Sequence, residues 1–221
     1  MDFDTDLIQN KGEIYSRKYR PILRFYDWIS PTISIGYLQN PDDLNLTQCL
    51  NDSVAIVRRP TGGRAIYHWK EITYSIFIPS GYYPSNLSIM ESYKLISECL
   101  VKGIRRLGIK AEIAPAIRGN LKNPSCFSSH ARYEVVFDGK KLIGSAQRRL
   151  KDGSFLQQGS FLISNEYKNL ENYVIDPIQL EGSISLLDIL GYIPPFERII
   201  DSLIIGFREH LQIEFKRLNI I

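Results

Sequence analysis

Apolar residues recur at helical spacing in two parts of the chain. In the first part, Ser88 and Glu91 have the spacing of a capping box. Apolar side chains then follow at intervals of three and four residues: Ile89, Tyr93, Ile96, Leu100, Ile104 and Leu107. Gly108 can supply a left-handed C-terminal cap. After Pro195, the second part places Ile199, Leu203, Phe207 and Leu211 at i, i+4 spacing. Each pattern predicts an amphipathic helix with one face on a core.

Shorter apolar or alternating runs, bounded by turn residues, predict the remaining elements. We expect strands over residues 23–28, 32–37, 54–58, 72–78, 111–114, 133–137, 141–149, 155–163 and 212–218. We also expect short helices over 4–10, 42–50 and 185–190, the second capped by Asp42-Asp43 and the third stopped by Gly191. Residues 60–63 are expected to form a turn whose return strand is 72–78.

Two Asp-Gly pairs, Asp138-Gly139 and Asp152-Gly153, predict tight turns that join three late strands into a meander. The stretch from Pro115 to Ser129 has no period, and we interpret it as a functional loop. Helices interleaved with hairpins predict an α+β (α/β) fold in one domain spanning 1–221. Its sheet is expected to be mixed, largely antiparallel and covered by helices.

Composition narrows the class of protein. No apolar run of the 221 residues approaches the roughly 20 that a membrane helix needs. The opening Met1-Asp2-Phe3-Asp4-Thr5-Asp6 is acidic and lacks a signal-peptide pattern, so we expect a cytoplasmic protein without membrane contact. The net charge is only +3 and no Lys/Arg block stands out, which argues against nucleic-acid binding. The three cysteines have no CxxC spacing, and neither a metal-ligand cluster nor a Walker-type loop is present.

A cationic, glycine-rich segment follows the strand predicted over 54–58. Gly62-Gly63 would let a ligand approach the backbone closely and would leave amides to hold a carbonyl or phosphate oxygen. Arg58, Arg59 and Arg64 add positive charge nearby. The alternative is a hairpin turn that needs positive φ, with its arginines in solvent. His68 either faces the same cavity or is a hydrogen-bonded strand histidine.

A candidate nucleophile, Cys126, lies in the polar loop before the meander, whereas Cys99 falls within a helix and resembles a core residue. Lys141 would return near the base of this loop across the Asp138-Gly139 hairpin. A neighbouring ammonium stabilises a thiolate and lowers the thiol pKa from about 8.5. The alternatives are an incidental thiol beside a solvated lysine, or a Cys–His pair with His130. His210, in the last helix, is interpreted as structural.

Two long motifs carry a family resemblance. The first runs from Arg58 to His68 as RRPTGGRAIYH and is followed by EITYS at 71–75. The second combines SCF at 125–127, Tyr133-Glu134 and GKKLIGSAQ at 139–147. Together they resemble the lipoate-protein ligase and octanoyltransferase superfamily, which also contains biotin-protein ligases. The similarity is greatest to its cysteine-dependent octanoyltransferases of the LipM type, since lipoate ligases usually have Ser-Gly-Gly-Gly at positions 61–64.

The resemblance implies a class II biotin/lipoate ligase-like catalytic domain, here without a C-terminal accessory domain. It also implies that Cys126 carries the acyl group and that Lys141 lowers its pKa. The motif residues are then expected to contact substrate: Arg59, Thr61, Gly62, Gly63, Arg64, His68, Tyr74, Ser75, Gly144, Ser145 and Ala146. No metal and no resident cofactor are expected.

The implied reaction moves an octanoyl group from the phosphopantetheine of acyl carrier protein to a lysine of a lipoyl-domain or glycine-cleavage H-type acceptor. The enzyme is expected to act as a monomer. Three alternatives stay open. The first is an ATP- and Mg-dependent lipoate ligase, in which Cys126 would be incidental. The second is an amidotransferase between lipoyl-bearing proteins. The third is a non-catalytic module that binds carrier or lipoyl proteins.

Overall fold

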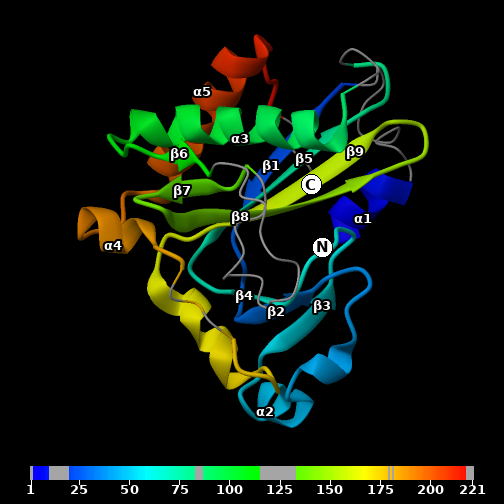
Figure 1. Cartoon of the computed structure of the whole chain (residues 1–221), viewed down its shortest axis with the longest axis vertical. Coiled ribbons are helices and arrows are strands. Elements are labelled where there is room, and N and C mark those ends of the chain that lie inside the picture. Colours follow the sequence, from blue (N-terminus) through cyan, green and yellow to red (C-terminus); the bar gives the residue numbers. More distant parts are fainter. Residues whose placement is uncertain are drawn as a thin grey trace.

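The computed structural model describes residues 2–9, 20–82, 87–114, 133–178, 180 and 182–217 (Figure 1). A six-stranded antiparallel sheet forms its centre, in the order β1-β5-β9-β8-β7-β6. The strands are β1 (Ile22–Tyr26), β5 (Ile72–Ile78), β9 (Phe155–Phe161), β8 (Lys140–Arg149), β7 (Val135–Phe137) and β6 (Glu112–Ile113). The expected meander β7-β8-β9 is confirmed. Asp138 and Gly139 have φ of 48° and 70°, as the tight turn between β7 and β8 requires.

A second sheet has three strands in the order β3-β2-β4. They are β3 (Ala55–Arg58), β2 (Thr32–Ile35) and β4 (Ile66–His68). β2 pairs with β3 in parallel and with β4 antiparallel, so it separates the two strands that flank residues 59–65. The predicted hairpin turn at 60–63 is therefore wrong. Its expected return strand, β5, belongs to the large sheet instead.

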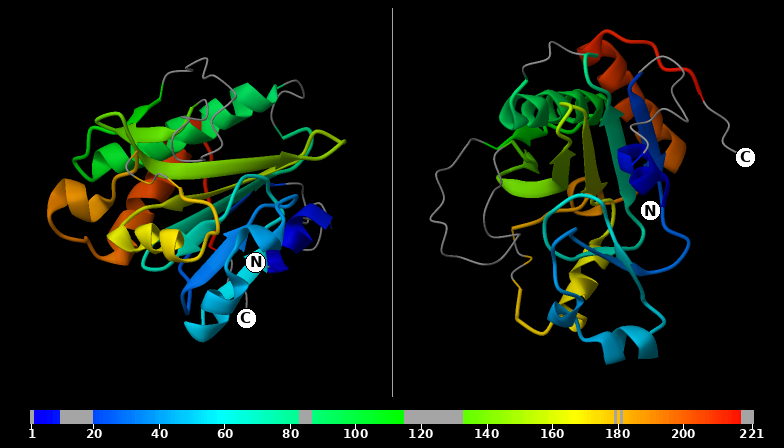
Figure 2. Two further views of the ribbon diagram at one scale, coloured as in Figure 1. Left: turned by 60° about the horizontal axis from the view of Figure 1, so that its bottom comes forward. Right: turned by 90° about the vertical axis from the view of Figure 1, so that its right-hand side faces the viewer.

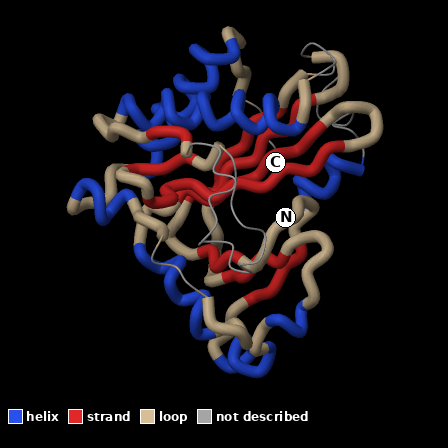
Figure 3. Tube along the Cα trace, viewed as in Figure 1, coloured by secondary structure: helices blue, strands red, loops and turns tan. Residues whose placement is uncertain are grey.

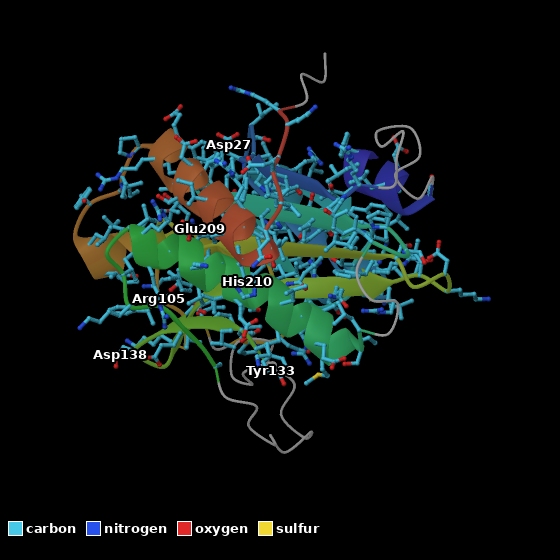
Figure 4. All side chains as sticks on the ribbon, turned by 90° about the horizontal axis from the view of Figure 1, so that it is seen from above. Asp27, Arg105, Tyr133, Asp138, Glu209 and His210 are labelled. Atoms are coloured by element: carbon cyan, nitrogen blue, oxygen red, sulfur yellow. The ribbon has the colours of Figure 1, made fainter. Side chains whose placement is uncertain are left out.

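Helices cover the large sheet on the side away from the small sheet, as Figures 1 and 2 show. These are α3 (Ile89–Arg106) and α5 (Phe196–Leu211), and Figure 4 labels Glu209 and His210 on α5. The predicted capping box of Ser88 and Glu91 is present at α3. The two helices cross closely, because a Cβ on Gly206 would lie 2.4 Å from the Gly103 nitrogen.

Apolar side chains of these layers form the core. The main cluster packs α3 and α5 against the large sheet and includes Ile76, Ile96, Leu100, Leu203 and Phe207. A second cluster lies between the small sheet and the 3-10 helix η2 (Asn165–Asn172). A third surrounds Leu7 on α1 (Asp2–Gln9). The short helix α4 (Leu186–Leu190) ends at Gly191, as predicted.

Two predictions of local structure are wrong. Asp42-Asp43 belong to a separate 3-10 helix, η1 (Pro41–Asp43), and α2 (Leu46–Asn51) is capped by the Asn45 side chain. The strand expected over 212–218 does not form in its described part, 212–217. Gln212 has a φ of 54°, which ends α5, and Ile213 and Phe215 then pack on the main core. No described helix is long and apolar enough to cross a membrane.

Candidate active site

A cavity of about 360 Å³ lies between the two sheets, within the usual size range of small-molecule sites. The segment 59–65 forms part of its wall, and β8 and β9 contribute residues from the large sheet. Figure 3 shows the two groups of strands that the cavity separates. Ten of the predicted site residues line it: Arg59, Thr61, Gly62, Gly63, Arg64, His68, Lys141, Gly144, Ser145 and Ala146. The described parts of the two sequence motifs therefore meet in one cavity.

Arg59 holds the glycine segment in shape from inside. It is 5% exposed, and its guanidinium donates to the Gly62 carbonyl at 2.8 and 3.1 Å and to the Arg64 carbonyl at 2.7 Å. Another nitrogen donates to the Ser34 carbonyl at 2.9 Å. Arg59 lines the cavity, and its described bonds give it a role in fixing the backbone of this segment, while its contact with substrate stays a prediction.

The glycine segment also contacts the turn that follows β2. A Cβ built on Gly36 would lie 1.9 Å from the Gly63 carbonyl oxygen, so only glycine fits at position 36. The Tyr37 amide donates to the Thr61 carbonyl at 2.9 Å. Arg58 donates from one nitrogen to the carbonyls of Gly36, Tyr37 and Gln39, at 2.8 to 3.0 Å. These contacts fix the two turns against each other.

A relay of buried side chains forms part of this wall. Arg59 donates to the Ser34 hydroxyl at 3.0 Å, and that hydroxyl lies 2.7 Å from His68 Nε2. His68 Nδ1 lies 3.0 Å from Glu71 Oε1. The Ser34 oxygen accepts from Arg59, so its own hydrogen is available to Nε2, and Nδ1 is the nitrogen placed to donate to the Glu71 carboxylate. His68 lines the cavity and is also a hydrogen-bonded residue of β4, so both alternatives that the sequence left open describe it.

The indole of Trp28 completes this relay. It stacks on His68 with ring centroids 4.4 Å apart, and it donates to Glu71 at 3.1 Å. Thr73 and Ser160 also donate to the Glu71 carboxylate. Although Ser34, His68 and Glu71 have the order of a serine–histidine–acid triad, Ser34 is 0% exposed and is held by Arg59. The relay therefore supports the wall and does not present a second nucleophile.

A second buried carboxylate, Asp4 on α1, connects the N-terminal helix to the cavity. It is 0% exposed and accepts hydrogen bonds from Arg24 (2.8 Å), Tyr26 (3.2 Å), Ser75 (2.7 Å) and Gln158 (2.8 Å). The amide oxygen of Gln158 accepts from the Thr61 hydroxyl at 2.9 Å. Burial first, and then the Asp4 charge, raise the pKa of the Tyr26 phenol. Asp4 thus positions Thr61 through one intermediary.

Tyr74 and Ser75 were also predicted to contact substrate. Neither belongs to the cavity lining that the described residues form, and both lie behind it. The Ser75 hydroxyl is bonded to Asp4. The Tyr74 hydroxyl lies 2.7 Å from the Ser145 hydroxyl, and burial raises the pKa of Tyr74 to about 12. Both residues therefore support side chains of the site from behind, and direct contact with substrate stays a prediction for them.

Lys141 is paired with a carboxylate. Its ammonium lies 2.8 Å from Glu134, and the two side chains are 5% and 4% exposed. Both line the cavity. Cys126, its predicted partner, and His130 lie outside the described residues, so the contact between Cys126 and Lys141 stays a prediction. His210 pairs with Glu98 at 3.2 Å on the helical side of the molecule, away from the cavity-lining residues.

Sequence reasoning missed several polar residues of the cavity. Glu134, Gln158 and Ser34 line the cavity, and Glu71 bonds His68 from beside the lining. Ser34 and Gln158 contact His68 and Thr61, which lie 34 and 97 positions away in the chain, whereas Glu71 is three residues from His68. Glu134 and Glu71 did stand within the two quoted motifs, next to residues chosen for their chemistry. Membership in those motifs was the one signal that pointed to them.

Comparisons with known proteins show the family of this chain. The family model of the lipoyl protein ligase A/B catalytic domain matches residues 1–208. The chain is 40% identical over 222 residues to octanoyltransferase LipM of Kyrpidia tusciae, covering 93% of this chain and 79% of that protein. It is 32% identical over 232 residues to octanoyltransferase LipM of Bacillus anthracis, with coverage of 97% and 82%.

Solved structures share the fold. A lipoate-protein ligase A bound with ATP superposes with a TM-score of 0.81 at 23% identity, covering 99% of this chain and 82% of that one. Ta0514, a lipoate protein ligase from T. acidophilum with bound lipoic acid, gives 0.76 at 23% identity, with coverage of 98% and 84%. At these identities the likeness shows the fold alone. The chain belongs to the lipoyl protein ligase A/B catalytic-domain family, and within it to the octanoyltransferases of the LipM type.

Proposed function

We propose that this octanoyltransferase takes its acyl group from acyl carrier protein, carries it as a thioester on Cys126, and delivers it to a lysine of a lipoyl-accepting protein. The observation that carries the proposal is that the glycine motif and the Lys141 motif of a LipM-type sequence line one cavity. Cofactor chemistry has no part in this scheme, because the donor thioester already holds an activated acyl group.

In the first step, the Cys126 thiolate attacks the carbonyl carbon of the donor thioester. A new carbon–sulfur bond forms and the carrier's phosphopantetheine sulfur leaves. Exchange of one thioester for another is nearly balanced in free energy, so the enzyme mainly has to position the groups. Backbone amides at Gly62-Gly63 are suited to hold the developing oxyanion, because Arg59 fixes this segment by its carbonyls.

In the second step, the lysine amine of the acceptor attacks the acyl carbon, a C–N bond forms, and the C–S bond to Cys126 breaks. One amine proton ends on the departing sulfur, which leaves as the Cys126 thiol, and the product amide is more stable than the thioester. Lys141, on the cavity wall, is proposed to alternate between stabilising the Cys126 thiolate and accepting a proton from the incoming amine. The eight-carbon chain is proposed to lie in the cavity, whose lining includes Gly144, Ala146 and Ile66. Burial of the chain contributes on the order of 0.8 kcal/mol for each methylene group.

Both protein partners are proposed to be acidic on the surface that approaches the enzyme. Arg64 is exposed and lines the cavity, and the exposed Arg58 stands at the neighbouring turn. Such charges at the rim of an interface mainly raise the association rate with a partner of opposite sign. We propose a lipoyl domain or a glycine-cleavage H-type protein as the acceptor.

The source of the acyl group is tested by leaving out ATP. The purified protein, mixed with octanoyl acyl carrier protein and an apo lipoyl domain, is expected to octanoylate the acceptor without nucleotide. Intact-mass measurement of the acceptor follows the reaction, and free octanoate without ATP is the negative control. Modification that needs octanoate, ATP and magnesium, with none from the carrier protein, would refute the proposed donor and identify a ligase.

A further inference from the structure

Asp4 lies on the N-terminal helix α1, outside both sequence motifs, yet it bonds a residue of the cavity wall. On the same helix, Leu7 packs in a cluster with Phe77 and Leu156 of the large sheet, so α1 is held against that sheet (Figure 1). The Asp4 side chain is 0% exposed and accepts from four side chains. One of these belongs to Gln158 on β9, which lines the cavity. The helix thus places a buried charge next to the wall.

The Asp4 carboxylate determines which end of the Gln158 amide faces it. A carboxylate only accepts hydrogen bonds, whereas a glutamine amide has a donating nitrogen and an accepting oxygen. With the amide reversed, two acceptor oxygens would face each other. The Gln158 nitrogen therefore donates to Asp4 at 2.8 Å, and this holds whatever else Gln158 contacts. The Arg24 guanidinium, 2.8 Å from Asp4, favours the charged carboxylate that imposes this direction.

This direction of donation continues to Thr61. Because the Gln158 nitrogen is turned toward Asp4, its oxygen is turned toward the Thr61 hydroxyl, 2.9 Å away. A threonine hydroxyl has a single hydrogen, and here that hydrogen goes to the Gln158 oxygen. Donation therefore runs one way, from Thr61 to Gln158 and from Gln158 to Asp4.

Thr61 also connects the two sheets at the cavity. Its side chain is bonded to β9 of the large sheet, while its carbonyl accepts from the Tyr37 amide, in the turn that follows β2 of the small sheet. A parallel link runs from Arg148 on β8 to the Pro60 carbonyl at 3.2 Å. The distance between the glycine segment and the large sheet, and so the width of the cavity, depends in part on the bond between Thr61 and Gln158.

We propose that Asp4 is a positioning residue for octanoyl transfer. By fixing the direction of the Gln158 amide, it holds Thr61 and the glycine segment at the distance from β9 that the acyl chain requires. This rests on the proposed binding of the chain in the cavity. A neutral amide at position 4 would reverse the Gln158 amide and turn its nitrogen toward Thr61. The hydrogen of the buried Thr61 hydroxyl would then lose its acceptor.

Asp4→Asn tests this assignment, because it keeps the shape of the side chain and adds a donating nitrogen. Arg24 and Ser75 donate to one oxygen of Asp4, and Tyr26 and Gln158 donate to the other. A guanidinium only donates, so the oxygen of the new amide stays with Arg24 and its nitrogen faces Gln158. We expect kcat/KM for transfer from octanoyl acyl carrier protein to an apo lipoyl domain to fall about 10-fold, the scale of one buried hydrogen bond.

A control variant and a charge exchange separate positioning from a loss of structure. Asp6→Asn, on the same helix and outside this chain of bonds, is expected to keep wild-type transfer. Gln158→Glu alone sets two carboxylates against each other and is expected to slow transfer. Combined with Asp4→Asn, it restores an acceptor for the Thr61 hydroxyl and leaves the total charge unchanged. The double variant is therefore expected to transfer faster than either single variant.

Two results would overturn the assignment: wild-type kcat/KM for Asp4→Asn, or a double variant that is not faster than both single variants. Thermal unfolding establishes that each variant is folded. Should a single variant not fold, Thr61→Val decides, because it removes the hydroxyl and leaves α1 intact. We expect it to lose about 10-fold in kcat/KM, and a wild-type value would refute the role of the hydroxyl.

Failure of the proposed donor is recognised separately, because the wild-type protein would then take no octanoyl group from the carrier protein. The same variants are in that case compared with octanoate, ATP and magnesium as the acyl source. The expected order of rates is the same, since the bonds from Asp4 to Thr61 do not depend on where the chain comes from. A different order would overturn the role of Asp4.

Discussion

Cys126→Ala is expected to abolish octanoyl transfer from acyl carrier protein to an apo lipoyl domain. Loss of a covalent nucleophile lowers turnover by roughly 10⁴-fold or more. The rate is followed by the intact mass of the acceptor, with thermal unfolding to show that the variant is folded. If the Cys126→Ala variant retained a tenth of the wild-type transfer rate, this result would show that the thiol is dispensable.

The chain offers a matched control for this experiment. Cys49 and Cys99 are 1% and 0% exposed, and burial raises the pKa of both thiols. Each is therefore a protonated core residue at neutral pH and a poor nucleophile. Cys49→Ala is expected to keep full transfer activity, so a loss confined to Cys126→Ala assigns the effect to position 126 and excludes a general sensitivity to thiol removal.

Gly36→Ala is expected to cost about 3 kcal/mol of folding free energy, because the new Cβ would lie 1.9 Å from the Gly63 carbonyl oxygen. Because the obstructing oxygen belongs to the backbone, the two turns must move apart. The hydrogen bond from the Tyr37 amide to the Thr61 carbonyl is then strained. For a chain of this size the unfolding midpoint falls by roughly 6–12 °C. Transfer activity is expected to fall as well, since the glycine segment forms part of the cavity wall.

Gly62→Ala is the stability control for this prediction. No atom lies within 4 Å of a Cβ at position 62, although it belongs to the same segment. Its unfolding midpoint is expected to stay close to that of the wild type. Equal midpoints for Gly36→Ala and Gly62→Ala would contradict the close approach of the two turns.

Much of the secondary structure follows from local rules. The capping box at Ser88, the Asp138-Gly139 turn and the stripe from Ile199 to Leu211 each depend on residues within a few positions of one another. The strand expected after Leu211 failed because an apolar, alternating sequence does not specify a pairing partner. Ile213 and Phe215 pack their partly buried side chains against the core without joining a sheet.

The order of the strands within the sheets was predicted less well than the strands themselves. The segment 54–58 and the segment 72–78 were interpreted as strands joined across a glycine turn, yet they belong to different sheets. Strand pairing is decided by contacts between distant parts of the chain, which periodicity does not record. The α+β class was confirmed because it needs only the kinds of element and their succession.

In the candidate site too, local patterns in the sequence predicted some residues but did not show which partners they contact. Arg59 and Lys141 were chosen by charge and motif, but their partners, the 59–65 carbonyls and Glu134, emerge only from the fold. The link from Asp4 through Gln158 to Thr61 joins residues up to 154 positions apart, and no local pattern announces it. In the sequence, Asp4 is one of several acidic residues near the N-terminus. Only the fold shows that it is buried and accepts hydrogen bonds from four side chains.

Cys126 is proposed to carry the octanoyl group between donor and acceptor. The most direct measurement is peptide mass spectrometry of the protein after incubation with octanoyl acyl carrier protein, without acceptor and without ATP. We predict an octanoyl mass on the peptide that contains Cys126, removed by hydroxylamine and then transferable to an apo lipoyl domain. Transfer to the acceptor with an octanoyl adduct on another residue, or with none on the protein, would contradict the account.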